Sequence, residues 1–151
     1  MSNHGLARLH LVAALIGFAV ILTFWLGSAI VELFGSHEAV MTVKQTIPWG
    51  LLLLVPALAT TGATGYRMSR GTTDPTVRTK LRRMQAIAAI GLLVLVPCVL
   101  YLGAVADRGL FDRSFWTVQT IELVAGAANV ALMSANLRDG LRLTGRITAS
   151  R

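Results

Sequence analysis

Two glutamates inside long apolar runs are the residues best placed to do chemistry. Glu32 lies near the end of the run Leu11–Phe34, and Glu122 lies within the run Phe115–Ala135. An ionisable side chain is costly in lipid, so such a position is a functional hypothesis by default. We expect the two carboxylates to approach each other at similar depth, with at least one of them protonated near neutral pH. They could also pair with a basic residue of the outer loops: Lys44, Arg108 or Arg113.

A divalent metal site is one reading of these carboxylates. His37 follows directly after the first apolar run, so Glu32, His37 and Glu122 together offer two carboxylates and an imidazole. Such ligands suit several divalent metals. The alternative is that each glutamate is protonated or bonded to a Gln, Thr or Trp partner, and that His37 is a solvated loop residue.

A haem site is a further alternative, with His10 and Met133 as its two axial ligands. His/Met ligation occurs in cytochromes, and Arg138 or Arg142 would then lie near the propionates. His37 cannot share this haem, because 27 helical residues place it about 40 Å from His10. The competing interpretation makes His10 an interfacial residue at a helix end.

The fourth apolar run carries a polar stripe at helical spacing. Its members recur at steps of three and four, so they share one face that should meet other protein: Gln119, Glu122, Gly126, Asn129, Met133 and Asn136. Ala127, Ala131 and Ala135 form a row of small residues beside the stripe, and we expect this row to allow close helix contact.

The elements that position these residues are four apolar runs, each near the 20 residues that a membrane-spanning helix needs. They cover residues 11–34, 49–66, 87–105 and 115–135. The predicted fold class is therefore all-α: one domain, residues 1–151, forming a four-helix transmembrane bundle. Pro48 fits the first turn of the second span, whereas Pro56 and Pro97 should kink spans two and three.

The basic residues predict the orientation of these spans. Of the 14 Lys and Arg residues, eleven fall on one side, in the N-terminal segment, the loop 67–85 and the tail 136–151. The outer loops hold only three, namely Lys44, Arg108 and Arg113. The positive-inside rule then places both termini and the middle loop in the cytoplasm.

Local signals refine the first and third spans. The first apolar run is longer than the core of a cleavable signal peptide, so we expect an uncleaved anchor. Asp74 or Thr73 should cap the third helix, with Pro75 in its first turn and an interfacial turn or two before the membrane. Five aromatic residues lie mostly near span ends, where an aromatic belt explains them: Trp25, Trp49, Tyr66, Tyr101 and Trp116.

Composition narrows the class of protein. Apolar residues make up 54% of the chain and charged residues 14%, which argues against an ordinary soluble enzyme. The single cysteine excludes a disulfide framework, and Cys98 reads as a packing residue. No nucleotide-binding, hydrolase or zinc-protease motif occurs, and nothing indicates nucleic-acid binding.

The overall form resembles the small four-helix inner-membrane proteins of bacteria. That resemblance rests on architecture and implies a multi-pass protein of the inner (plasma) membrane. Our leading interpretation is a non-enzymatic accessory protein, whose polar stripes hold its helices together or meet a partner. Its surroundings are then the lipid bilayer and a second copy or another membrane protein. Proton or cation binding at Glu32 and Glu122, and haem binding at His10, stay open as alternatives, so the cofactor is unknown.

Overall fold

The computed structural model describes residues 3–143, and every regular element in this range is a helix. In chain order the elements are α1 (Asn3–Phe34), α2 (His37–Ser69), α3 (Pro75–Ile90), the π-helical turn η1 (Gly91–Leu95), α4 (Val96–Asp107) and α5 (Arg113–Leu143). α3, η1 and α4 follow one another without a gap and form one rod. The described range therefore holds four long helices, each long and apolar enough to span a membrane.

The second helix begins well before its apolar run. Ser36 caps it, because its hydroxyl oxygen accepts a hydrogen bond from the Ala39 N–H at 3.3 Å. Only residues 35 and 36 separate α1 from α2, so the expectation of an outer loop that fills the interval between the apolar runs 11–34 and 49–66 is wrong. Lys44 is accordingly a helical residue, and Pro48 lies inside α2 rather than in its first turn. The polar residues in the first turns of α2 lower the local hydropathy, so the apolar run alone does not reveal that the helix begins at His37.

The third rod begins as expected. The Asp74 carboxylate accepts a hydrogen bond from the Thr76 N–H at 2.7 Å, and Pro75 occupies the first turn. Farther along, Pro97 lacks an N–H and leaves a carbonyl of the preceding turn without its usual partner. The π-helical turn η1 immediately before Pro97 is the distortion that accommodates it.

The fourth helix is also longer than its apolar run. Asp112 precedes it and accepts hydrogen bonds from the Ser114 hydroxyl at 2.6 Å and the Phe115 N–H at 3.0 Å. α5 continues eight residues past Ala135, so half of the predicted tail 136–151 is helical and residues 144–151 lie outside the described range. An ion pair of 2.6 Å between Arg83 and Asp139 joins α3 to α5 in this extension.

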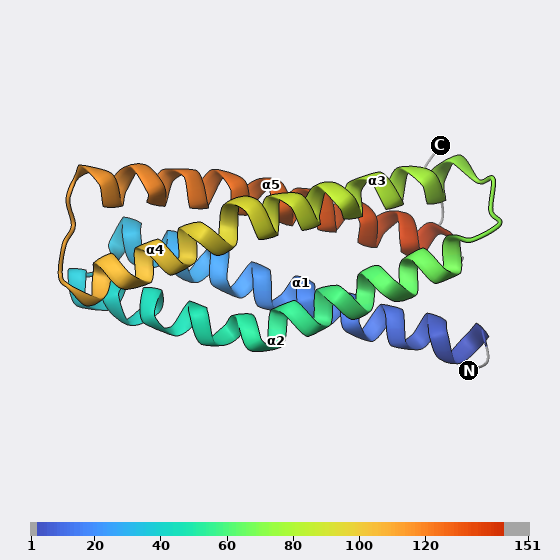
Figure 1. Cartoon of the computed structure of the whole chain (residues 1–151), viewed down its shortest axis with the longest axis horizontal. Helices are drawn as coiled ribbons and strands as arrows, with labels where there is room; N and C mark the ends of the chain where they lie inside the picture. The colour runs from blue at the N-terminus through green and yellow to red at the C-terminus, as the bar shows by residue number, and fades with distance from the viewer. Residues whose placement is uncertain (1–2, 144–151) are drawn as a thin grey trace.

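The four rods lie side by side (Figure 1). α1 packs mainly against α2, α2 against α4, and α5 against α1, α3 and α4. The turn between α1 and α2 lies at one end of the molecule with the α4–α5 connection, and the two ends of the described chain lie at the other (Figure 1). We call these the turn end and the terminal end.

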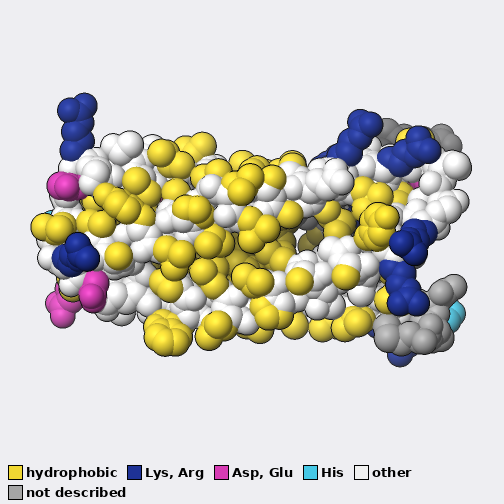
Figure 2. Space-filling model, in the orientation of Figure 1, with side chains coloured by type: hydrophobic (Ala, Val, Ile, Leu, Met, Phe, Trp, Pro, Cys, Tyr) yellow, Lys and Arg dark blue, Asp and Glu magenta, His cyan; other side chains and the backbone are white. Residues whose placement is uncertain are grey.

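Two apolar clusters fill the interior. The cluster towards the turn end contains Val40, Cys98, Leu102, Ala106 and Phe115. The second contains Ile21, Leu54, Ile87 and Met133. Figure 2 shows a broad apolar belt on the outer surface between the two ends of the molecule, with most Lys and Arg side chains of the visible face gathered at the terminal end. Cys98 packs inside the first cluster, in agreement with a packing role.

Candidate functional site: a buried lysine between two glutamates

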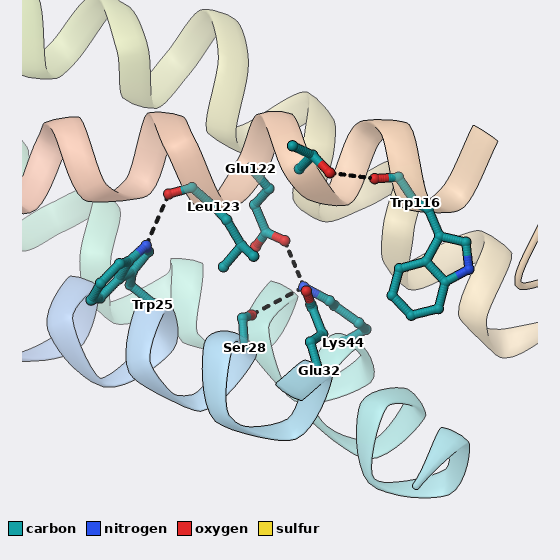
Figure 3. Close-up of polar contacts among 8 residues, drawn as sticks. Trp25, Ser28, Glu32, Lys44, Trp116, Glu122 and Leu123 are labelled. Carbon is teal, nitrogen blue, oxygen red and sulfur yellow. Dashed lines mark hydrogen bonds and ion pairs between the residues drawn. The ribbon is translucent and has the colours of Figure 1, made fainter. Parts of the chain in front are cut away.

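Lys44 is the basic residue that the two glutamates meet. Its side chain is 1% exposed, and its Nζ lies 2.5 Å from Glu122 Oε2 and 3.2 Å from Glu32 Oε1. The glutamates come from α1 and α5, and the lysine comes from α2, so three helices converge here (Figure 3). The carboxylates therefore meet through a shared cation. Arg108 and Arg113, the other two basic residues considered for this role, are exposed.

The two carboxylates are not equivalent partners of Lys44. The ammonium donates a hydrogen bond to Glu122 and a second one, of 3.0 Å, to the Ser28 hydroxyl (Figure 3). Glu32 Oε1 is close enough for an ion pair, yet it has no hydrogen-bond partner in the described part of the chain. Glu32 therefore contributes charge to the site without the directional bond that Glu122 makes.

Because the cluster is buried, its net charge determines how much free energy it costs to hold these three residues inside the protein. The Glu32 side chain is 6% exposed and the Glu122 side chain 10% exposed. One ammonium facing two ionised carboxylates leaves a net charge of −1 in a place that water reaches poorly. An uncompensated buried charge is expensive, and a bound proton or a second cation would remove it.

His37 lies apart from this cluster. Its ring is exposed and packs edge-on against the Phe111 ring, with 4.7 Å between the centroids. Among residues 3–143 no group of three His, Cys, Asp or Glu side chains is arranged to hold a metal ion. The Lys44 ammonium instead stands between Glu32 and Glu122, where a bound metal would have to be.

The helices around the cluster are fixed by a close contact between α1 and α5. Trp25 donates a hydrogen bond of 2.9 Å to the Leu123 carbonyl (Figure 3). Its ring lies against Gly126. A Cβ on Gly126 would lie 2.6 Å from Trp25 Cδ1, so only glycine fits here without a shift. The expectation that Trp25 belongs to an interfacial belt is wrong, because its indole is packed between helices.

The polar stripe of α5 faces the interior, as its spacing indicates. Gln119, Glu122, Gly126, Asn129 and Met133 are all buried. The expected alanine row is wrong, since Ala127 and Ala131 are exposed on the outer surface. The amide of Gln119 and the side-chain oxygens of Asn129 and Asn136 have no hydrogen-bond partner among the described residues. The stripe thus presents polar atoms inward that are not used for helix packing.

A cavity lies beyond the stripe, near the terminal end. Its volume is about 560 Å³, and both His10 and Met133 line it. A smaller cavity of about 330 Å³ is lined by Glu122 and Asn129, and the two share Leu58 as a common wall. Figure 2 shows a hollow in the apolar face, where the α2 and α3 ribbons of Figure 1 diverge. Arg138 and Arg142, which we expected beside a haem, do not line the larger cavity.

The comparisons with known proteins give no further guide. No family model matches the chain, and neither the curated proteins nor the solved structures include a significant match. The class of protein rests on the helices and the site. Four apolar helices are compatible with a multi-pass membrane protein, and a charged cluster lies buried among them.

Proposed function

We propose that this chain is a non-enzymatic multi-pass membrane protein that binds one exchangeable proton at Glu32, Lys44 and Glu122. The observation that carries the proposal is a single ammonium buried between two carboxylates. One proton makes the cluster neutral, which is the favoured charge in a low-dielectric interior. Metal-ion binding has less support, since Lys44 already supplies the cation.

The geometry favours Glu32 as the residue that carries the proton. Glu122 is held as a carboxylate by its 2.5 Å hydrogen bond from the Lys44 ammonium. Glu32 is farther from that ammonium and receives no hydrogen bond from it. A protonated Glu32 leaves a neutral pair of Lys44 and Glu122, with Ser28 accepting the ammonium's second hydrogen bond.

Exchange of this proton would take place at the turn end. Glu32 is two residues from the end of α1, where Phe34 is 85% exposed. Gln119 lies one helical turn from Glu122 in the direction of the start of α5, and its buried amide has both a donor and an acceptor free among residues 3–143. Such a group can orient a water molecule between the cluster and the aqueous phase.

The proposed orientation places the turn end outside. Among residues 3–143, nine Lys and Arg residues belong to the segments at the terminal end, and with Lys44 buried in α2 only Arg108 and Arg113 remain for contact with the outer phase. The positive-inside rule then gives a four-helix bundle with both termini in the cytoplasm. In a bacterium the corresponding location is the inner membrane, with the cluster near the periplasm.

The accessory role remains part of the proposal, in a narrower form. The stripe on α5 is buried against the chain's own helices, which supports its use in holding them together. A second copy or another membrane protein would have to meet the apolar outer surface instead, where Trp49 is 75% exposed.

The proton can be counted by titration of the purified, folded protein in weakly buffered detergent. Wild type should release one more proton per chain than Glu32→Gln as the pH is raised, because the amide has no proton to give. Glu38→Gln is the matched control, since Glu38 is exposed and lies just past the same turn. It removes one exposed carboxyl and leaves the buried cluster intact.

Two results would contradict the proposal. Wild type and Glu32→Gln could give the same curve, which would mean that no exchangeable proton resides on Glu32. Alternatively, the proton lost in Glu32→Gln could be one that wild type already releases in the acidic range of a carboxyl in water.

A further inference from the structure

The larger cavity holds features that the proton site does not explain. It lies between α1, α2, α3 and α5, on the terminal side of the molecule, and its wall is mostly apolar. Its volume of about 560 Å³ suits a bulky organic group and far exceeds the space that a metal ion needs. Two imidazoles and three thioethers line it, from a chain with only 3 His and 5 Met. They belong to His4, His10, Met68, Met84 and Met133.

His10 is oriented in the way that metal-binding histidines are. Its Nδ1 lies 3.1 Å from the Thr61 carbonyl and 3.0 Å from the Thr64 hydroxyl. That hydroxyl gives its own proton to the Thr60 carbonyl at 2.6 Å, so Nδ1 is the donor to both oxygens. The lone pair then resides on Nε2, which has no partner in the described range. A ring N–H bonded to a carbonyl is the usual second-shell arrangement of a ligating histidine.

A thioether lies next to this imidazole. A Cβ on Gly65 would be 3.1 Å from His10 Cε1 and 3.3 Å from Met84 Sδ, so both side chains fill the space that this glycine leaves. Met84 was not expected as a ligand from the sequence, because it precedes the predicted third span. Met133, which was expected, lines the same cavity and packs in the apolar cluster of α1, α2 and α3.

Basic side chains complete the cavity. Arg8 and Lys80 line it beside His10 and Met84, and Lys80 is half-buried. They would pair with carboxylates at the edge of a bound apolar group. A copper ion could use the same imidazole and thioether, but it would leave the apolar volume empty. A lipid chain would fill the volume without any need for the anchored imidazole.

We infer that this cavity binds one haem without a covalent bond, with His10 and Met84 as the axial ligands and Arg8 and Lys80 beside the propionates. The apolar volume accommodates the macrocycle, and the imidazole and thioether form a known axial pair. The only cysteine, Cys98, is packed in the other apolar cluster, so no thioether attachment is available. This inference is independent of the proton site.

Haemin titration of the purified protein tests the inference, with absorption spectra in the visible range. We expect a Soret shift that saturates at one haem per chain, and a low-spin spectrum after reduction. His10→Ala should weaken binding by on the order of 100-fold or more, since loss of a second-shell partner alone costs about 10–100-fold. Met84→Ala should retain haem and lose the low-spin signature.

The chain supplies matched controls at the turn end. His37→Ala and Met41→Ala remove the same kinds of side chain from positions outside the cavity, and both should bind haemin as wild type does. Gel filtration and thermal unfolding of every variant separate a lost ligand from a lost fold.

Three outcomes would overturn the inference. One is a folded wild-type protein that gives no Soret shift with excess haemin. Another is equal haemin affinity for His10→Ala and wild type. The third is loss of the low-spin signature in Met133→Ala with Met84→Ala unchanged, which would remove Met84 as the axial ligand. Purified protein that carries stoichiometric copper or lipid and cannot take up haemin would also overturn the inference.

Discussion

At the residue scale, the stability of the buried cluster depends on Lys44. Burying a lysine and two glutamates costs several kcal/mol per ion, and the attraction among them offsets that cost only when the geometry is good. The hydrogen bonds from the ammonium to Glu122 and Ser28 supply that geometry. Removing one partner of such a group is far more costly than replacing the whole group with apolar residues.

Lys44→Met should therefore destabilise the protein strongly, by about 3–5 kcal/mol, because it leaves two buried glutamates without their cation. The measurement is the free energy of unfolding in mixed micelles. Thr46→Met is the control, since Thr46 is exposed on the same helix, and it should be nearly neutral. Adding Glu122→Gln to Lys44→Met should restore part of the loss. Equal stability of Lys44→Met and Thr46→Met would place Lys44 in water.

Asp112 gives a pH-dependent prediction outside the membrane-spanning segments. The hydrogen bonds from the Ser114 hydroxyl and the Phe115 N–H lower the pKa of its carboxyl below the usual aspartate value. A lowered pKa stabilises the fold above the unfolded-state pKa, and the benefit is lost as the pH falls through the folded-state pKa. Asp112→Ala should lower the melting temperature at neutral pH, and the difference from wild type should shrink in acid. A difference that persists unchanged at low pH would contradict this origin.

The approach of the glutamates could be predicted from the sequence, with Lys44 as one of three candidate partners, but the burial of Lys44 could not. Glu32 and Glu122 interrupt apolar runs at similar depth, which is visible in the residue pattern alone. Lys44 lies among Thr42, Gln45 and Thr46, and this polar stretch reads as a loop. Lys44 is buried because the short turn after α1 makes α2 begin at His37, so that Lys44 lies about two helical turns inside the bundle.

At the scale of the element, one contact determines which face of α5 points into the interior. The polar stripe and the alanine row are neighbours on the helix, so spacing alone places both near a contact. Trp25 resolves the choice, because its indole rests on Gly126 and bonds to the Leu123 carbonyl. That contact turns Ala127 and Ala131 outwards.

Gly126→Ala should destabilise the protein by about 1–3 kcal/mol, since the new methyl group overlaps the Trp25 ring. Ala131→Leu adds a larger group to the same helix at an exposed position and should be nearly neutral. Thermal unfolding of both variants in one detergent makes the comparison. Destabilisation by Ala131→Leu with a tolerated Gly126→Ala would reverse the assigned faces of α5.

The helices themselves were largely predictable, and their ends were not. Hydropathy locates the apolar centre of each span, yet every helix extends beyond it. The extensions depend on local bonds such as the Asp74 cap and on the ion pair between Arg83 and Asp139. Only the first of these has a sequence signature, because Asp74 is followed directly by Pro75.

At the scale of the whole molecule, the two ends differ in charge and in chemistry. The turn end holds the buried charge cluster, and the terminal end holds most of the described Lys and Arg residues and the cavity with His10. The two cavities are neighbours, because Leu58, Gly62, Ile87 and Ala88 line both of them. The proposed proton site and the proposed haem site therefore lie towards opposite ends of the molecule.

Reporter fusions test the proposed orientation. Fusions at Thr73 and after Arg151 should report a cytoplasmic location, and fusions at Ser36 and Leu110 a periplasmic one, because eleven of the 14 Lys and Arg residues fall in the N-terminal segment, the loop 67–85 and the tail 136–151. The positions follow the observed connections between helices. A periplasmic signal at Thr73 would invert the orientation and place the charge cluster near the cytoplasm.

The most direct test of the central claim is infrared difference spectroscopy of the carboxyl groups at neutral pH. The account predicts one protonated carboxyl in wild type that is shielded from water, because a single lysine cannot neutralise two buried glutamates. Its band should vanish in Glu32→Gln and persist in Glu38→Gln. Wild-type protein without a protonated carboxyl at neutral pH, or a band that survives in Glu32→Gln, would contradict the account.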